Sequence, residues 1–305
     1  MLFRSGAATK PFFALATASS TIFTARLVDR IGKGVRGAPR DALVADLAPP
    51  EIRGAAFGLR QSLDTVGAFL GPLLAVALML ATGDDFRAVF WWAVIPAVLS
   101  VALLAFGIRD APPSRTVRAN PLARDSLCHL GPACHRIVLL GAVFSLARFS
   151  EAFLVLRAQT TGVPLAFVPM VMVVMNVVYA SAAYPFGKWS DRMAARDLLA
   201  ASLVVLVAAD LVLAAADGPA ALAGGVVLWG LHMGMSQGLL ARMVADVAPA
   251  ELRGTAFGAF NFASGLALLV ASGLAGFLWE AHGPPATFLA GAGFAAATWL
   301  LLRRF

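Results

Sequence analysis

The sequence has little charge for its length. Only 13% of its 305 residues are charged and 60% are hydrophobic, whereas a soluble domain has about 25% charged and about 45–50% apolar residues. The hydrophobic residues stand in runs of about 20, the length that crosses ~30 Å of hydrocarbon. A soluble helical protein would show amphipathic stripes in their place. The composition therefore predicts an all-α polytopic membrane protein.

Cysteine and the usual signatures of catalysis are scarce as well. The two cysteines, Cys128 and Cys134, lie in one connecting segment and do not make a disulfide framework. They stand with two histidines in CHLGPACH, whose spacing fits no common zinc pattern, so we predict no metal site. The spans contain no nucleotide-binding loop or catalytic triad. We therefore predict no catalytic residues, no cofactor and no enzyme activity.

Positive charge exceeds negative charge, with a net charge of +7. Such a balance can indicate a nucleic-acid partner, but in a multispanning chain the retention of Lys and Arg in cytoplasmic loops explains it better. The cationic loops are those near Arg53, Lys188 and Arg253, together with residues 109–136 and the C-terminal tail. We therefore expect the lipid bilayer as a partner, no nucleic acid, and a cytoplasmic C-terminus.

A long internal repeat organises the chain. VADLAPPEIRGAAFG (Val44 to Gly58) returns as VADVAPAELRGTAFG (Val244 to Gly258), and eleven of these fifteen residues match at an offset of 200. A repeat of this length indicates duplication of a whole bundle of helices.

Ten spans can be placed from the hydrophobic runs and the turns between them. They cover residues 2–23, 24–47, 55–81, 86–108, 137–156, 164–186, 198–216, 222–247, 255–279 and 285–304. Residues 1–108 would form an N-terminal bundle, 109–136 a cytoplasmic linker and 137–305 a C-terminal bundle of six helices. The offset of 200 leaves the fifth and sixth spans without partners, so we expect two further helices before the first residue of this chain.

Two motifs resemble those of the major facilitator superfamily. Gly187-x-x-x-Asp191-Arg192 is similar to the family's cytoplasmic loop signature, and Arg26-x-x-Asp29 stands in the place of its helix-four motif. The resemblance implies two six-helix halves, of which this chain would supply helices three to twelve. It also implies a monomeric transporter, here expected in a bacterial inner membrane.

A third motif, Gly67-x-x-x-Gly71-Pro72, resembles the helix-five signature of antiporters in that family. The two glycines lie one turn apart and Pro72 removes a backbone donor, which predicts a tight helix contact and a weak point in the helix. Plain packing is the alternative reading.

The second span carries an unusual row of charges. At 100° per residue, seven of its eight charged side chains fall within an arc of roughly 140°, with Asp46 on the opposite side. The seven are Arg26, Asp29, Arg30, Lys33, Arg36, Arg40 and Asp41. Such a face cannot lie against acyl chains, because each charge costs several kcal/mol there, so it should line water or contact protein. We expect it to hold an anionic or polar part of a solute, with a structural ion-pair network as the alternative.

Further polar residues in later spans are Arg60, Asp64, Arg148, Glu151 and Asn176. Asp64 stands roughly 15 Å into its helix. Burial there favours a neutral carboxyl group, whereas Arg60 one turn away favours the charged form, and this balance suits a group that loads and releases a proton. We therefore expect Asp64 to carry a coupling proton, with Glu151 as the second candidate. Asn176 fits an interhelical hydrogen bond as well as a ligand.

Charges at the helix ends predict a latch that closes one side of the bundle and breaks when it opens. The residues concerned are Asp46, Arg53, Asp191, Arg192, Asp246 and Arg253. A solvated cationic loop is the alternative.

We expect a secondary transporter of a small organic solute that works by alternating access, most favourably by proton-coupled efflux. Proton- or ion-coupled import is the alternative within this class. From another class, a membrane-embedded enzyme or an inactive truncated remnant is the alternative.

The loop charges make one prediction about topology. Cysteines introduced at Ser114 and at Gly218 should react with a membrane-impermeant thiol reagent from opposite sides of the membrane, because only the first lies in a cationic segment. Labelling of intact and everted vesicles measures this, and labelling of both from one side would contradict the topology.

Overall fold

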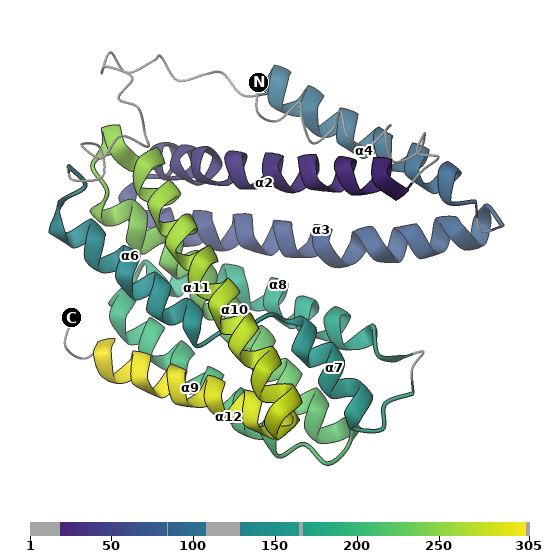
Figure 1. The fold of residues 1–305 in the computed structure, drawn as a ribbon. Helices are drawn as coiled ribbons and strands as arrows, with labels where there is room; N and C mark the ends of the chain where they lie inside the picture. The colour runs from purple at the N-terminus through teal and green to yellow at the C-terminus, as the bar shows by residue number, and fades with distance from the viewer. Residues whose placement is uncertain (1–18, 84, 108–128, 165–166, 303–305) are drawn as a thin grey trace. The chain divides into compact units, whose positions relative to one another are not determined.

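The computed structural model describes residues 19–83, 85–107, 129–164 and 167–302. These residues form α-helices that short turns connect, and none of them lies in a β-strand (Figure 1). The all-α fold is confirmed. The helices are α2 (Ser19–Leu47), α3 (Arg53–Ala81), α4 (Phe86–Gly107), α6 (Gly131–Leu146), α7 (Ala152–Thr160), α8 (Met170–Ser190), α9 (Ala195–Ala214), α10 (Pro219–Val247), α11 (Arg253–His282) and α12 (Pro284–Leu302).

Several helical segments among the described residues are long and apolar enough to cross a membrane. They are Pro50–Ala81, Met170–Ser190, Ala195–Ala214, Ala250–His282 and Pro284–Leu302. Large hydrophobic side chains stay exposed along them, such as Leu269 and Phe277 on α11. In water such a surface would be unfavourable, whereas acyl chains solvate it.

The described residues divide into two compact units. One contains the described parts of Met1–Asp41 and Leu70–Ala119, and the other contains Ala42–Phe69 with the described parts of Asn120–Phe305. The long helices α2 and α3 each contribute residues to both units.

The second unit is built around α10. This helix packs against α8 and α9, while α12 packs against α9, and α11 packs against α6 and α12. Figure 1 shows α9 and α12 running side by side. The fully buried side chains of Phe144, Trp229 and Phe288 fill the space between these helices.

Glycine determines how closely α3, α8 and α10 approach one another. A Cβ on Gly58 of α3 would lie 2.5 Å from the carbonyl oxygen of Ala183 and 3.0 Å from the Cα of Gly187, both on α8. A Cβ on Gly238 of α10 would lie 3.1 Å from the backbone nitrogen of Gly58. Backbone atoms cannot move aside as a flexible side chain does, so this three-helix contact requires glycine.

The fifth predicted span is not one continuous helix, which corrects the prediction. α6 ends at Leu146, residues 147–151 are non-helical, and α7 runs only from Ala152 to Thr160. The backbone N–H of Ser150 donates to Oγ of Ser272 on α11 at 3.1 Å. Irregular backbone is tolerated at membrane depth where other groups supply such hydrogen bonds. We call residues 147–151 the α6–α7 break.

Other helix boundaries also differ from the predicted ones. α2 is helical from Ser19, the first described residue, and runs without interruption through the predicted boundary at residues 23 and 24; residues 2–18 of the first predicted span lie outside the described residues. α6 begins at Gly131, inside the predicted linker, because Pro132 suits the first turn of a helix. α8 begins at Met170 instead of Pro164, with Pro169 as its N-cap residue.

The predicted tight contact at Gly67 and Gly71 is not found. No described atom outside the helix lies within 4 Å of the place where a Cβ would stand on either residue. Both glycines are on exposed turns of α3, and Pro72 continues the helix to Ala81. Among the described residues, the close approach of α3 to other helices occurs instead at its beginning, near Gly58.

The repeat adopts the same local structure twice. Short 3-10 turns at Pro50–Ile52 and Ala250–Leu252 lead into α3 at Arg53 and into α11 at Arg253. Each turn follows a proline in extended backbone conformation, at ψ 148° and ψ 140°. The residues that the two copies share therefore adopt the same backbone conformation in both places.

The repeat supplies a matched pair of substitutions. Gly58→Ala should lower the stability of the protein by about 1–3 kcal/mol, because the new Cβ meets backbone atoms of α8. Gly258→Ala, at the equivalent position 200 residues on, has no described atom within 4 Å of the new Cβ. It should leave stability unchanged or raise it by up to ~1 kcal/mol through helix propensity. Thermal unfolding in detergent compares the two, and equal effects would contradict the role assigned to Gly58.

Candidate functional site

Two ion pairs link the copies of the repeat in a reciprocal way. Arg53 Nη1 lies 3.2 Å from Oδ1 of Asp246, and Nη1 of Arg253 pairs with Oδ1 of Asp46. Asp46 and Asp246 are equivalent in the repeat, as are Arg53 and Arg253, so each arginine pairs with the aspartate of the other copy. Four of the six charges predicted for the latch therefore lie in pairs between the two copies.

Asp191 joins the same group of charges by capping α3. Its Oδ1 accepts a hydrogen bond from the backbone N–H of Gly54 at 2.7 Å, and its Oδ2 accepts one from Ala55 at 2.9 Å. The first N–H groups of a helix have no partner within the helix and carry partial positive charge. The aspartate of the Gly187–Arg192 motif therefore supplies both acceptors and charge.

Arg242 connects Asp191 to the reciprocal pairs. Its guanidinium lies 3.7 Å from Oδ1 of Asp191 and 3.3 Å from Oδ2 of Asp246. The latch predicted from the sequence contains Arg192 and not Arg242, whereas in the structure the side chain of Arg192 is exposed. The repeat held a signal, because Arg242 stands where the first copy has Ala42.

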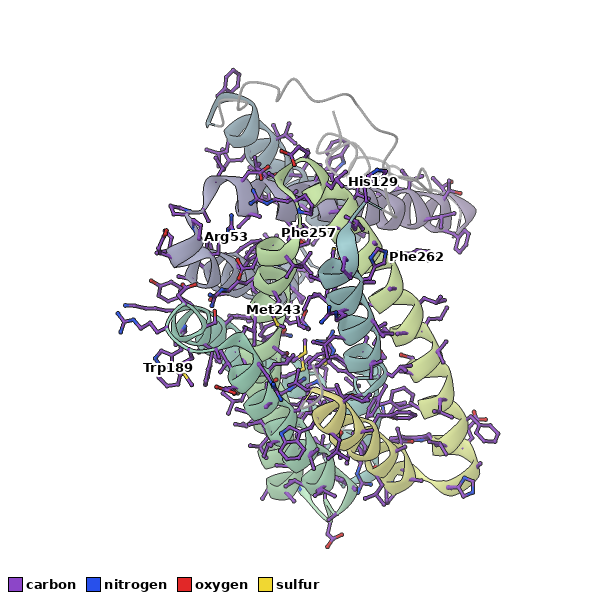
Figure 2. The ribbon with its side chains drawn as sticks, turned by 90° about the vertical axis from the view of Figure 1, so that its left-hand side faces the viewer. Arg53, His129, Trp189, Met243, Phe257 and Phe262 are labelled. Atoms are coloured by element: carbon purple, nitrogen blue, oxygen red, sulfur yellow. The ribbon has the colours of Figure 1, made fainter. Side chains whose placement is uncertain are left out.

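We call Asp46, Arg53, Asp191, Arg242, Asp246 and Arg253 the charged junction. Two aromatic rings from the repeat pack next to it: Phe57 and Phe257, whose centroids lie 6.0 Å apart and whose side chains are fully buried. Arg53 and Phe257 are labelled in Figure 2. The junction therefore combines ion pairs with an apolar contact made by equivalent residues.

A second group of polar residues lies further along α3. Arg60 Nη1 donates to Oδ2 of Asp64 at 3.2 Å, and Nη2 donates to Oε1 of Gln61 at 2.7 Å. The Tyr179 hydroxyl on α8 lies within electrostatic range of Arg60. The side chain of Asp64 is 51% exposed, so its predicted burial is not found, although α8 contacts the same part of α3: the hydroxyl of Ser62 donates to the carbonyl oxygen of Ala180 at 2.6 Å.

The α6–α7 break contributes two charges to the same region. Arg148 and Glu151 are both half-buried, and both lie within electrostatic range of the Tyr179 hydroxyl. The Arg148 guanidinium lies 3.0 Å from Sδ of Met233, and it donates to Oε1 of Gln237 once that amide is oriented to accept. We call Arg60, Asp64, Arg148, Glu151 and Tyr179 the polar cluster.

The structure describes the side chains of four of the seven charged residues predicted to share one face of α2. The side chains of Arg26, Asp29 and Arg30 lie outside the described part of the chain. The remaining members of the row are Lys33, which is exposed, Arg36 and Arg40, which are half-buried, and Asp41, which is buried. Arg40 Nε lies 3.3 Å from Oδ1 of Asp41.

Two other polar residues have structural partners. Asn176 Nδ2 donates to the carbonyl oxygen of Met172 on its own helix at 2.8 Å. Arg157 is buried and donates to the carbonyl oxygens at the end of α9, those of Leu213 at 2.9 Å, Ala214 at 3.2 Å and Ala216 at 2.9 Å. A cation at this position satisfies unpaired carbonyls and the helix dipole together.

The cysteine–histidine segment gathers no metal ligands in the part that is described. Cys134 is buried in α6, whereas His129 and His135 are exposed and Cys128 lies outside the described residues. Nδ1 of His135 makes a hydrogen bond with the carbonyl oxygen of Gly131 at 2.7 Å.

Comparison with known proteins identifies the family. The sequence model of the Major Facilitator Superfamily matches residues 2–156 and 137–305. The chain belongs to this superfamily. It is 30% identical over 282 residues to an uncharacterized MFS-type transporter of Methanocaldococcus jannaschii, covering 90% of this chain and 69% of that protein. It is 27% identical over 283 residues to an uncharacterized protein of Mycobacterium tuberculosis, covering 89% and 68%.

Solved structures share the fold. The human organic anion transporter MFSD10 superposes with a TM-score of 0.83 at 18% identity, over 99% of this chain and 75% of that one. The MFS transporter FucP in the outward conformation superposes with a TM-score of 0.80 at 16% identity, over 99% and 81%. Superfamily members are transporters of small solutes and not enzymes, so the chain is a polytopic membrane protein of a transporter family.

The hydrogen bonds of Asp191 make a prediction about the charged junction. Asp191→Asn keeps the shape of the side chain but sets an NH2 group against one of the two N–H groups that begin α3. That N–H then loses its acceptor, which costs about 1–3 kcal/mol when buried. The amides of Gly54 and Ala55 should exchange hydrogen faster, and the melting temperature should fall. Asp197→Asn, an exposed position on the next helix, is the control; similar exchange in both variants would contradict the capping role.

Proposed function

We propose that this protein transports a small organic solute across a membrane by alternating access, with proton-coupled efflux as its favoured mode. The observation that carries this proposal is the charged junction, in which the arginine of each copy of the repeat forms an ion pair with the aspartate of the other copy. A transporter of this kind needs one contact between repeats that closes one side of the bundle and can open again.

The junction has the energetics of a reversible latch. The carboxylates of Asp46 and Asp246 are exposed by 51% and 37%. Ion pairs with this much solvent access contribute about 0–1 kcal/mol each, because water replaces the partner at little cost. The junction can therefore separate within a conformational equilibrium of a few kcal/mol. Phe57 and Phe257 would seal the closed state against water. In our proposal this side is cytoplasmic.

The polar cluster is our candidate for solute and proton binding. Its two cations, Arg60 on α3 and Arg148 in the α6–α7 break, would attract an anionic or polar group of the solute. Glu151 and Asp64 are acids beside these cations, as a residue that exchanges a proton requires. Interrupted helices commonly form such sites in transporters, because the break frees backbone groups to face a ligand.

Transport assays in vesicles test the proposal. The chain is reconstituted, and a panel of labelled anionic, neutral and cationic solutes is offered with and without a pH gradient. Uptake into everted vesicles that depends on an acidic interior supports efflux, whereas gradient-driven uptake into right-side-out vesicles overturns the efflux assignment. Failure to move any solute in either orientation would overturn the transport function of the chain as given.

Substitutions in the polar cluster separate coupling from binding. Asp64→Asn should abolish transport driven by the pH gradient but leave exchange of solute between the two sides, because exchange needs no net proton movement. Arg148→Gln should instead weaken solute binding by about 10- to 150-fold, since one charge-assisted hydrogen bond is worth about 1.5–3 kcal/mol. Arg136→Gln, at an exposed position on α6, is the control. If Asp64→Asn transports solute normally under a pH gradient, Asp64 does not carry the coupling proton, and Glu151→Gln is the next variant to test.

A further inference from the structure

A carboxyl group without a described partner lies inside the second unit. Asp210, on α9, has no exposed surface at all. Neither of its carboxylate oxygens has a hydrogen-bond donor among the described residues. Buried polar groups nearly always have such partners, so this residue requires an explanation.

The carboxyl group is enclosed by Phe149 and Gly291. A Cβ on Gly291 of α12 would stand 2.8 Å from Oδ2 of Asp210 and 2.9 Å from Cε1 of Phe149, so the three groups occupy one small space. Phe149 belongs to the α6–α7 break, and its ring packs against the rings of Trp229 and Phe288 at centroid distances of 5.3 and 5.5 Å. The carboxyl group is therefore surrounded by apolar and aromatic groups.

Charged side chains on the neighbouring elements do not neutralise Asp210. From α10, the imidazole of the buried His232 faces Ser202, two turns earlier on α9, and Nδ1 bonds to its carbonyl oxygen at 2.7 Å. From α7, the guanidinium of Arg157 donates its hydrogen bonds to carbonyl oxygens at the end of α9. From the α6–α7 break, Arg148 faces Met233. The facing helix α12 has no ionisable side chain between Pro284 and Leu302.

An isolated charge in such surroundings is unfavourable. Removing a carboxylate from water without a partner costs far more than a fold can tolerate, and the group becomes neutral instead. A proton is the one ligand that neutralises a carboxylate without occupying additional space, and on the side of Gly291 even one added carbon would lie 2.8 Å from Oδ2.

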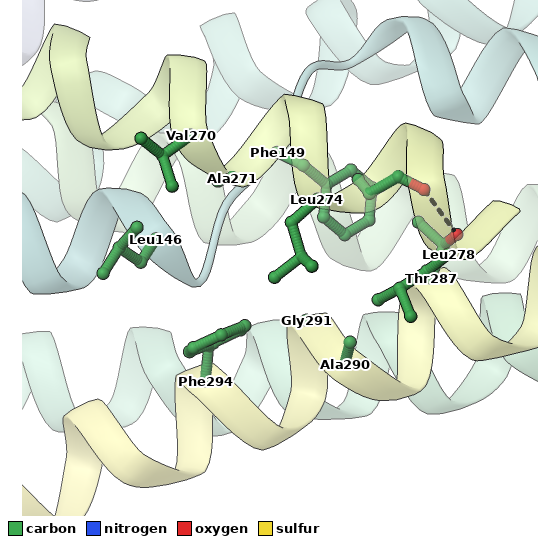
Figure 3. Close-up of a pocket in the computed structure, with 11 residues that line it drawn as sticks. Leu146, Phe149, Val270, Ala271, Leu274, Leu278, Thr287, Ala290, Gly291 and Phe294 are labelled. Carbon is green, nitrogen blue, oxygen red and sulfur yellow. Dashed lines mark hydrogen bonds between the residues drawn. The ribbon is translucent and has the colours of Figure 1, made fainter.

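The wall beside Asp210 also faces a crevice. Phe149 and Gly291 line an apolar pocket of about 200 Å³ between α11 and α12, together with Leu146, Leu274 and Phe294 (Figure 3). The hydroxyl of Thr287 at this pocket already donates to the carbonyl oxygen of Ala275 at 3.0 Å. A shift of the Phe149 ring would thus connect the carboxyl group with the crevice.

We propose that Asp210 is a buried proton-binding site whose proton is retained while Phe149 and α12 are packed against α9. When the α6–α7 break moves, water enters and accepts the proton: the O–H bond breaks, and its electron pair stays on Asp210. The resulting carboxylate cannot return to the closed packing until it is protonated again. The site thereby ties the position of the break to proton binding.

This site is distinct from the polar cluster, where we place solute and the coupling proton. Its protonation can be measured without a solute, so failure of the transport proposal leaves the test of Asp210 intact. Only the idea that the break moves during transport rests on the proposed function.

Infrared spectroscopy of the purified full chain tests the proposal. A protonated carboxyl group has a carbonyl stretching band that a carboxylate lacks. The wild-type protein should show this band at neutral pH, and Asp210→Asn should lose an intensity that corresponds to one carboxyl group. Asp197→Asn, an exposed aspartate on the same helix, should keep the band. An unchanged band in Asp210→Asn, or no band in the wild-type protein, would overturn the assignment.

A second pair of variants keeps the test decisive if Asp210→Asn fails to fold. Gly291→Ala inserts a Cβ between Asp210 and Phe149, whereas Gly293→Ala on the same helix meets no described atom within 4 Å. After transfer to heavy water, the carboxyl band of Gly291→Ala should shift about tenfold faster than that of the wild type, because overpacking opens the enclosure. Gly293→Ala should match the wild type. Equal rates in both variants would show that packing at Gly291 does not guard the proton.

Discussion

Close approach of helix backbones is the constraint on which the second unit depends. In a bilayer, hydrophobic side chains gain little by leaving acyl chains for each other, so helices associate through tight packing and polar contacts. Gly58, Gly187 and Gly238 lack a Cβ at the point where α3, α8 and α10 meet. Larger residues would separate α3 from α8, and Asp191 would no longer reach the first amides of α3.

The same packing gives polar groups their distinct roles. Where helices end, charges remain accessible to water, and the reciprocal pairs of the charged junction are individually weak. Within the helices, some polar groups bond to one another, as Arg60 and Asp64 do in the polar cluster. Others, such as Asp210, are buried among apolar side chains. The α6–α7 break connects these two situations, because Arg148 and Glu151 lie on one part of it and Phe149 covers Asp210 on the other.

The sequence predicts structural features that repeat along the chain, but it does not predict features that depend on the surroundings of a single side chain. The offset of 200 predicted the turns before Arg53 and Arg253 and the charges that meet there. Hydropathy could not reveal the α6–α7 break, because residues 147–151 are short and flanked by apolar runs. Depth along α3 suggested burial for Asp64, but burial depends on which helices lie alongside, and no local pattern encodes that. The sequence does not indicate a role for Asp210, because a single aspartate in an apolar run has no other polar residue at a helical spacing that would mark a site.

The exchange of arginines between the repeats has an evolutionary consequence. When residue i of one copy contacts residue j of the other, and j of the first contacts i of the second, the contact has the form of an isologous interface between identical subunits. Arg53 with Asp246 and Arg253 with Asp46 satisfy that rule within a single chain. An ancestral half-length protein with one aspartate and one arginine at these positions would already have carried everything needed to pair with itself. Fusion of two such genes would then have turned a contact between two subunits into the internal latch of one chain.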